Sequence, residues 1–346
     1  MIKLSIIVPV YNAEAFLERA INSISSYKGN DIEFILINDG STDNSKSICD
    51  RFANQDSRIK VFHIENRGVS HARNFGMKKS EGEYIQFIDS DDFLTENAVE
   101  EILDAIKKYN SDLVNFGYIK YYKNELKRSE IKYNELIVND YNKFLAVCGY
   151  GYKNLLLHSP CFKVYKKDIL VRNNIEFNEN FDFGEDLLFN IEYLKVIDNV
   201  SIIPKALYNY NLEQGDNSLT NKYREDRFEK FYLLVRKLVD FLKSREFDTK
   251  ENLENIYSTF YISSLYCTQH IAFAENINYE KKTNLINEVV NNELVRSLAL
   301  EFKNGSKQNT ILTKLLLKKN VKGILSYFKF KSLVSNKLKR LVQKYK

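Results

Sequence analysis

Short apolar runs that alternate with amphipathic segments constrain the fold of this chain more than any other feature of its sequence. The apolar runs occupy residues 4–10, 34–37, 59–64, 84–88 and 113–118, and helical spacing marks residues 14–27, 45–54, 69–79 and 97–109. Strands that are apolar on both sides are typical of a parallel sheet whose two faces are covered. Short links between strands and helices favour the same architecture. The sequence therefore predicts an α/β fold, with a mostly parallel sheet and helices on both of its faces.

The pattern changes after residue 118, and a region of different character follows. Further regular pieces are expected as strands at residues 161–165 and 200–203 and as a helix at 185–196. From about Arg224 onward the chain has helical spacing and no strand signals. We therefore expect three parts: an α/β domain over residues 1–220, a helical region over 221–301, and a basic amphipathic tail over 302–346.

The charge of the chain is divided unequally between its body and its C-terminal end. Thirteen of the 51 basic residues follow Glu301 and none of the 46 acidic residues does, which leaves 38 basic and 46 acidic side chains in the first 301 residues. Apolar residues such as Leu312, Ile324 and Phe328 recur at helical spacing among these basic residues. A basic amphipathic helix is typical of the interface of an anionic membrane.

The tail has other candidate partners besides a membrane. A helical extension packed on the body, or a surface joining two copies of the chain, would also place a basic face in water. Nucleic acid is disfavoured, because no recognition motif accompanies the charge. We expect an anionic membrane surface as the partner, no nucleic acid, and a homodimer as a further candidate assembly.

The cysteines and the N-terminus bear on the compartment. The four cysteines are far apart and form no Cys-x-x-Cys pair, so we expect them to be reduced and buried rather than to bind zinc or form disulfides. Pro9 interrupts the first apolar run and no small-residue cleavage site follows it, which disfavours a signal peptide. No apolar run approaches the roughly 18 residues that span a bilayer. A cytoplasmic protein at the inner face of the membrane is expected.

Acidic side chains gather at the predicted carboxyl ends of the strands, where ligands bind in such sheets. Asp39 follows the second strand, and Asp89 and Asp91 follow the fourth. Two unit charges about 4 Å apart repel by about 4 kcal/mol at an effective dielectric constant of about 20. Protonation or a bound cation would relieve this repulsion, and Asp89 and Asp91, at alternate positions, suit a hard divalent ion. The alternative is that Asp39 and Asp91 cap helices.

The chain lacks the glycine-rich motifs of several nucleotide-binding classes. It has no G-x-x-x-x-G-K-[ST] segment, and no G-x-G-x-x-G follows the first strand. These absences argue against kinases, ATPases and dinucleotide-dependent dehydrogenases. A bound phosphate would instead be held by a metal ion and by Arg or Lys.

Four motifs together resemble glycosyltransferase family 2. They are Ser5-Ile6-Ile7-Val8-Pro9-Val10-Tyr11-Asn12, Asn38-Asp39-Gly40-Ser41-Thr42-Asp43, Gly68-Val69-Ser70-His71-Ala72-Arg73-Asn74, and Phe87-Ile88-Asp89-Ser90-Asp91-Asp92. The resemblance implies the GT-A fold and inverting, metal-dependent transfer of a sugar from a nucleotide sugar, with UDP the favoured nucleotide. It also implies a glycan or lipid-linked acceptor in cell-surface polysaccharide synthesis.

The resemblance also implies roles for individual residues. Asp39 would accept a hydrogen bond from the uracil N3–H, and Pro9 and Tyr11 would border the base. Arg73 would lie near the nucleotide. Asp89 would meet the ribose or the metal, and Asp91 would ligate Mn²⁺ or Mg²⁺.

The expected general base lies in the segment from Phe181 to Phe189, which resembles the family's Glu-Asp motif. We expect Asp186 to be this base, with Asp182 as the less favoured substitute and Glu185 holding the acceptor or orienting the loop. Apolar neighbours would raise the pKa of Asp186 toward working pH by desolvation. The alternative is an acidic first turn of an ordinary helix.

Weaker candidates for acceptor or phosphate contacts are Lys163 and His158. Lys163 could supply positive charge, and the alternative is a solvated lysine. His158 lies in a Tyr-rich segment between the catalytic motifs, where ordinary packing is the alternative. The chain has no Trp and thus lacks the Gln-x-x-Arg-Trp signature of processive synthases, so we expect one sugar to be added per encounter.

Two other functions compete with this reading. A sugar nucleotidyltransferase shares the layered fold, but it would carry a Gly-rich, Arg-containing N-terminal loop that this chain lacks. A non-catalytic relative could act as a binding or scaffold subunit. The presence of Asp39, Asp91 and Asp186 argues against that second alternative.

Overall fold

The computed structural model describes residues 2–122, 129–212, 223–303 and 310–344, except the side chains of residues 302, 303, 310 and 334–344. The chain forms two compact units. The first unit comprises Met1–Asp216 and Lys237–Asn252, and the second comprises Asn217–Arg236 and Leu253–Lys346. The expected domain boundary near residue 220 lies outside the described residues.

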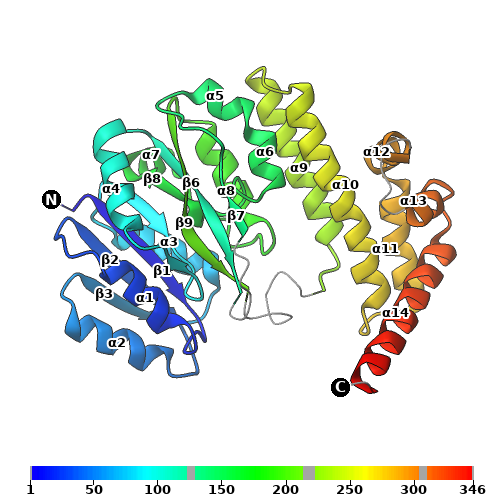
Figure 1. Ribbon diagram of the computed structural model, residues 1–346, viewed down its shortest axis with the longest axis horizontal. Coiled ribbons are helices and arrows are strands. Elements are labelled where there is room, and N and C mark those ends of the chain that lie inside the picture. Colours follow the sequence, from blue (N-terminus) through cyan, green and yellow to red (C-terminus); the bar gives the residue numbers. More distant parts are fainter. Residues whose placement is uncertain (1, 123–128, 213–222, 304–309, 345–346) are drawn as a thin grey trace. The chain divides into compact units, whose positions relative to one another are not determined.

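The first unit is built on one mixed sheet with strand order β3-β2-β1-β4-β8-β6-β9-β5 (Figure 1). The strands of its parallel part are β1 (Leu4–Val10), β2 (Ile32–Asp39), β3 (Ile59–Ile64) and β4 (Tyr84–Phe87). The others are β5 (Phe93–Leu94), β6 (Leu113–Tyr121), β7 (Ser129–Ile131), β8 (Lys163–Lys166) and β9 (Val200–Asn211), of which β7 pairs with β6. Every residue of β1 and β2 is buried, as the apolar runs at 4–10 and 34–37 predicted for those positions; β2 also extends beyond its run at both ends.

One strand enters the sheet in a direction that the sequence pattern does not reveal. β8 lies between β4 and β6 and is antiparallel to both, whereas β6 and β9 are parallel. The strands expected as the fourth and fifth of a parallel series are therefore not neighbours. The apolar periodicity of a strand reports its burial but not its partner, so this insertion could not be inferred from periodicity.

Helices connect the strands and carry the motifs. In the first unit they are α1 (Leu17–Ser25), α2 (Ser45–Gln55), α3 (Val69–Lys79), α4 (Ala98–Tyr109), α5 (Tyr141–Ala146), α6 (Cys148–Lys153), α7 (Lys167–Arg172) and α8 (Glu185–Leu194), with a 3₁₀ turn at Pro160–Phe162. A Cβ atom on Gly76 would lie 2.4 Å from Ile7 Cγ2. The glycine therefore allows α3 to pack closely on β1, which fixes the height of the α3 side chains over the sheet.

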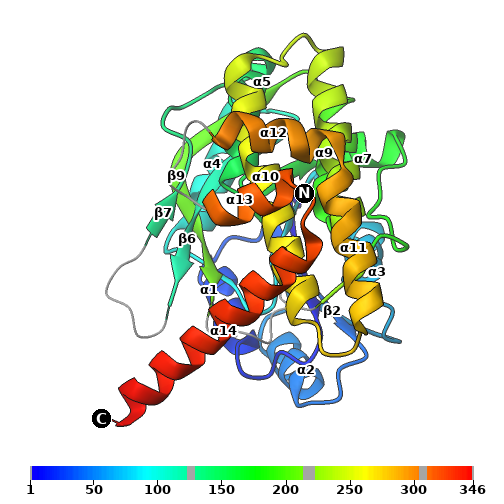
Figure 2. The same ribbon diagram turned by 90° about the vertical axis from the view of Figure 1, so that its right-hand side faces the viewer.

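The later helices are α9 (Arg227–Ser244), α10 (Lys250–Phe273), α11 (Tyr279–Asn291), α12 (Glu293–Lys303), α13 (Thr310–Leu317) and α14 (Val321–Lys344). The expected helical character of this region is confirmed (Figure 2). Of the tail's apolar residues, Leu312, Leu316, Ile324 and Phe328 are at most 3% exposed. The expectation that such side chains face a membrane is wrong for these four, because the second unit itself covers them.

All four cysteines are buried and free, as predicted. Within the described part of the chain, no helix combines the length and the apolar character that crossing a bilayer requires.

Candidate active site

The candidate site lies at the carboxyl ends of the parallel strands. β2 and β4 flank β1 on its two sides and run parallel to it, so their carboxyl ends share one edge. Neighbouring strands are about 4.8 Å apart, which places the axes of β2 and β4 about 10 Å from each other. Asp39 ends β2, and Asp89 and Asp91 follow β4. The carboxylates expected to serve the nucleotide and the metal therefore lie along the same edge.

The loops that follow β1 and β2 hold each other by reciprocal hydrogen bonds. Asn12 Oδ1 accepts from the backbone N–H of Thr42 at 2.8 Å, and the Asn12 N–H donates to Ser41 Oγ at 3.1 Å. Asn12 has a φ of 47°, a left-handed conformation that asparagine tolerates better than most residues. Beside this joint, Pro9 is buried in β1, whereas Tyr11 is 53% exposed. The two loops thus form one preformed rim with an aromatic side chain at its surface.

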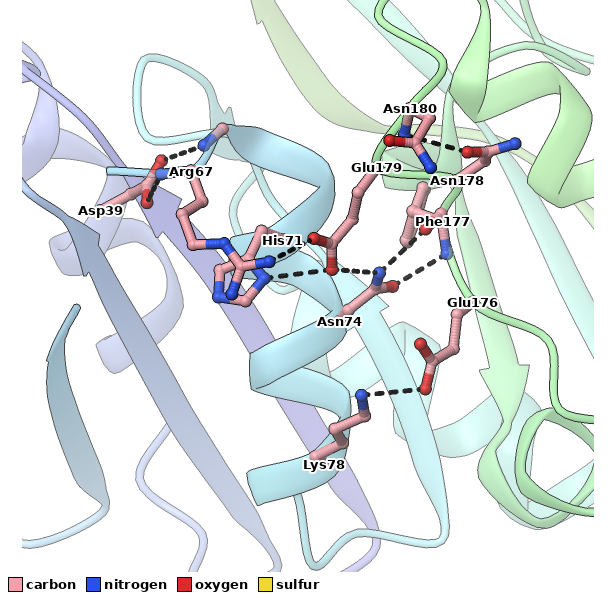
Figure 3. A network of polar contacts seen from close by, with 11 residues as sticks. Asp39, Arg67, His71, Asn74, Lys78, Glu176, Phe177, Asn178, Glu179 and Asn180 are labelled. Atoms are coloured by element: carbon pink, nitrogen blue, oxygen red, sulfur yellow. Dashed lines mark hydrogen bonds and ion pairs between the residues drawn. The ribbon is translucent and has the colours of Figure 1, made fainter. Parts of the chain in front are cut away.

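Asp39 organises the start of α3. Its two carboxylate oxygens accept from the backbone N–H groups of Arg67 and Gly68 at 2.9 and 2.8 Å (Figure 3). Asp39 is only 3% exposed, so these bonds satisfy a nearly buried carboxylate. The uracil contact expected of Asp39 stays a prediction.

A polar network joins α3 to the segment that precedes α8, as Figure 3 shows. Glu179 accepts from the Arg67 guanidinium at 3.2 Å and pairs with His71 Nδ1 at 3.0 Å. The Asn74 side chain binds the main chain of Phe177 twice, donating at 2.9 Å and accepting at 2.8 Å. His71 and Asn74 belong to the third motif of the sequence, but their partners Glu179 and Phe177 are more than 100 positions away, so this pairing was not predicted. The network anchors the segment that leads into α8 against α3.

Arg73, on the second turn of α3, joins the two acidic segments of the site. Its guanidinium donates to Asp186 Oδ1 at 2.6 Å and to Asp89 Oδ1 at 2.8 Å. It also lies over the Phe177 ring, 5.2 Å from the ring centre, and its side chain is only 3% exposed. Burial would lower the pKa of Arg73, but Asp186 and Asp89 raise it well above the ordinary value. The residue is therefore a fixed buried cation.

Asp186 lies in the first turn of α8, directly after Glu185. Its side chain is 28% exposed, so it is reachable from solvent although Arg73 holds one oxygen. Burial raises the pKa of Asp186 to about 7, against the lowering effect of Arg73. A carboxyl group with a pKa near neutrality can accept a proton in a reaction at physiological pH.

The residues after β4 suit a divalent cation. Burial raises the pKa of Asp91 to about 6, and the charge of Asp89 adds to this rise. A bound cation would relieve the repulsion between the two carboxylates and favour the ionised form of Asp91. Among the described residues, no three His, Cys, Asp or Glu side chains form a closed metal site. Two carboxylates on one loop instead fit an ion that takes its remaining ligands from a diphosphate and from water.

Tyr208 and Asp92 hold the loop after β4 in place, although the sequence indicated no role for either side chain. The Tyr208 hydroxyl accepts from the Asp89 N–H at 3.2 Å and donates to Asp92 Oδ2 at 2.7 Å. Asp92 Oδ1 accepts from the backbone N–H of Asn211 at 2.7 Å. Asp92 belongs to the fourth motif of the sequence, but its hydrogen bond to a tyrosine 116 positions away left no local signal.

The weaker candidates, Lys163 and His158, are held by contacts within their own part of the fold. Lys163 has no exposed surface and donates to the carbonyl oxygens of Leu156 and Ser159 at 2.7 and 2.6 Å, so the alternative of a solvated lysine is wrong. Burial lowers the pKa of Lys163 to about 7. The His158 ring packs on Tyr152 with ring centres 4.6 Å apart, and burial, reinforced by Lys163, lowers the pKa of His158 to about 3. Acceptor or phosphate contacts from these two residues stay predictions.

The chain matches known proteins in sequence and in fold. The family model described as Glycosyl transferase family 2 matches residues 5–172. Glycosyltransferase GlyG of Streptococcus pneumoniae is 30% identical over 61% of this chain and 71% of its own length. The minor teichoic acid biosynthesis protein GgaB of Bacillus subtilis is 31% identical over 70% of this chain.

Among solved structures, Staphylococcus aureus TarS residues 1–349 in complex with UDP-GlcNAc has a TM-score of 0.62 at 20% identity, covering 96% of this chain and 92% of that one. This likeness agrees with the GT-A fold that was expected. The chain spans less than two thirds of several curated relatives, 62% of one and 27% of GgaB.

Proposed function

The chain belongs to glycosyltransferase family 2, and from this membership we propose that it transfers a sugar from a nucleotide sugar to a hydroxyl group of a cell-surface glycan or lipid-linked acceptor. The observation that carries the proposal is the bridge by Arg73 between Asp89 and Asp186. This bridge brings Asp89, a proposed metal ligand, and Asp186, the proposed base, to one guanidinium group. The name of GgaB, a teichoic acid biosynthesis protein, supports a surface glycan as the product.

We propose a UDP-sugar as the donor. The nucleoside would lie on the rim formed by the loops after β1 and β2, with the base between Pro9 and Tyr11 and its N3–H directed at Asp39. The distance of about 10 Å between the axes of β2 and β4 leaves the diphosphate near Asp89 and Asp91. TarS, which has the same fold, binds UDP-GlcNAc.

Asp91 and Asp89 would hold Mn²⁺ or Mg²⁺. When bound, such an ion neutralises negative charge that develops on a departing diphosphate. The protein contributes the two carboxylates, whose mutual repulsion disfavours the ionised loop on its own. The Tyr208 hydroxyl keeps this loop in place through the Asp89 N–H and Asp92.

Asp186 would act as the general base of an inverting transfer. The acceptor hydroxyl attacks the anomeric carbon, its proton passes to Asp186, and the bond from that carbon to the diphosphate oxygen breaks. Arg73 binds Oδ1 of Asp186, which leaves Oδ2 for the acceptor. Attack from the side opposite the leaving group inverts the configuration at the anomeric carbon.

We further propose that the protein works at the inner face of the cell membrane. Residues 1–220 would carry the catalytic side chains, and the basic residues after 301 would attach the protein to the membrane. The support is the charge distribution, since no acidic residue follows Glu301. A lysine or arginine near an anionic bilayer is worth about 1 kcal/mol of binding free energy.

A panel of nucleotide sugars tests the proposal for the donor and the reaction. The protein is incubated with each sugar and Mn²⁺ or Mg²⁺, with and without membrane extract as acceptor, and release of the nucleoside diphosphate is measured. One or a few UDP-sugars should give release that requires the metal and rises with acceptor. Donor binding without any release would instead favour the scaffold alternative.

A further inference from the structure

The end of α10, the start of α11 and the first half of α14 come together in the second unit (Figure 2). Residues of these three helices line a groove. Its volume is about 610 Å³, within the range of roughly 300–1,000 Å³ that is usual for small-molecule sites. The residues that line it are Ala272, Phe273, Tyr279, Lys282, Lys322, Leu325, Ser326, Lys329, Ser332 and Leu333. Phe273 packs edge-on against Phe328, with ring centres 5.9 Å apart, which ties α10 to α14 at this point.

The charged residues of the groove are all positive. Lys322 and Lys329 are exposed and seven positions apart on α14, so they lie on the same face of that helix. Lys282 extends from α11 and donates to the Ala272 carbonyl at 3.0 Å. No carboxylate is among the described residues that line the groove. Three ammonium groups without an acidic neighbour in the lining favour an anionic occupant.

Exposed apolar side chains lie next to these lysines. Phe273 is 43% exposed, Tyr279 57% and Leu333 61%. Large apolar groups in water are unremarkable singly, but these three share one groove with the lysines and give it an apolar part. A purely ionic ligand would leave them uncovered, and a purely apolar ligand would leave the lysines without a partner.

We propose that this groove binds one anionic phospholipid of the membrane surface. Its phosphate lies between Lys322 and Lys329, and an acyl chain covers Phe273 and Leu333. The proposal builds on the membrane attachment proposed above and narrows it from a general attraction of the basic tail to a single site. It requires no donor, metal or catalytic residue of the first unit.

Vesicle binding by the full chain tests the charged half of the site. The groove variant is Lys322→Gln/Lys329→Gln, and the matched control is Lys314→Gln/Lys318→Gln, which removes two exposed lysines that do not line the groove. Binding is measured on phosphatidylcholine vesicles with and without phosphatidylglycerol. Relative to the unaltered protein, the affinity of the groove variant for the anionic vesicles should fall at least ten times further than the affinity of the control does. Equal losses would overturn the site and leave only diffuse attraction.

A second pair tests the apolar half. Leu333→Ser should weaken binding to the anionic vesicles severalfold, whereas Leu300→Ser, at a leucine that is 57% exposed and outside the groove, should not. Equal effects of the two serine variants would overturn the acyl-chain contact. Melting temperatures of all variants verify folding, which substitutions at exposed positions should preserve.

Three further outcomes would overturn the inference in distinguishable ways. If inorganic phosphate competes for the groove as effectively as the lipid does, the groove is a phosphate site rather than a lipid site. A change in oligomeric state on light scattering, with vesicle binding intact, would indicate an interface between copies. If the unaltered protein does not prefer vesicles with phosphatidylglycerol over those without it, the proposed membrane attachment by the tail is wrong as well. Release of UDP in the absence of vesicles reports on the transferase proposal separately.

Discussion

The Arg73 guanidinium lies 2.6 Å from Asp186 Oδ1, although the two residues are 113 positions apart in the sequence. The same guanidinium donates to Asp89, so one buried cation sets the distance between the proposed base and the loop of the proposed metal ligands. Separating the partners of a buried ion pair would leave an uncompensated charge in the interior, so such pairs stay together. The proposed base is therefore oriented before an acceptor arrives, and its contribution can be tested separately from donor binding.

Asp186→Asn should remove turnover and leave donor binding intact. The amide is the same size as the carboxyl group and its oxygen still accepts from Arg73, but it cannot take a proton from the acceptor. Turnover should fall by about 10²–10⁴, the usual contribution of a general base. Product formation and calorimetric donor affinity, both in the presence of metal, provide the two measurements.

The matched control is Asp182→Asn, four positions earlier in the same segment. It should retain most of the turnover of the unaltered protein. The reverse result, an inactive Asp182 variant and an active Asp186 variant, would assign the proton acceptor to Asp182.

The turnover number should rise with pH and level off above about 7, where burial places the pKa of Asp186. Only the ionised carboxylate can accept the proton, so activity is lost on the acidic side, by about tenfold per pH unit well below the pKa. Burial and Asp89 also raise the pKa of Asp91, to about 6, so metal and donor must be saturating at each pH. A turnover number that falls as the pH rises through 7 would contradict a carboxylate base.

The strands and the acidic loops of the site could be predicted from sequence because their signals are local. An apolar run such as residues 4–10 reports its own burial, and a parallel arrangement brings the polar residues after each strand to one edge. Asp39, Asp89 and Asp91 were therefore assigned to that edge correctly.

The connections between these loops depend on contacts distant in sequence and could not be predicted. Nothing near Arg73 indicates that it reaches Asp186, or that Tyr208 binds the Asp89 N–H. The same limit explains the error in the tail. Ile324 and Phe328 have the spacing of an amphipathic helix whether their apolar face meets a membrane or the rest of the helical unit.

Asp91→Ala should abolish the dependence of donor binding on metal. The variant loses one of the two proposed ligands, and Arg73 already binds Oδ1 of the other, Asp89. Donor affinity in Mn²⁺ should fall to the value measured in chelator, by at least tenfold. Asp104→Ala, at an exposed aspartate on α4, is the control and should bind the donor normally. Unchanged metal-dependent affinity in the Asp91 variant would exclude this residue as a ligand.

Tyr208→Phe should weaken metal binding through the shape of the loop, without removing any proposed ligand. Loss of the hydroxyl takes a donor from buried Asp92 and an acceptor from the Asp89 N–H, at a cost of about 1–3 kcal/mol in the free energy of unfolding. The control is Tyr193→Phe, because the Tyr193 hydroxyl also makes two hydrogen bonds. It donates to the Asp112 carbonyl, just before β6, and accepts from the Lys166 N–H. Both variants should melt earlier, but only Tyr208→Phe should raise the Mn²⁺ concentration needed for half-maximal turnover. Equal metal requirements in the two variants would mean that Tyr208 contributes to stability alone.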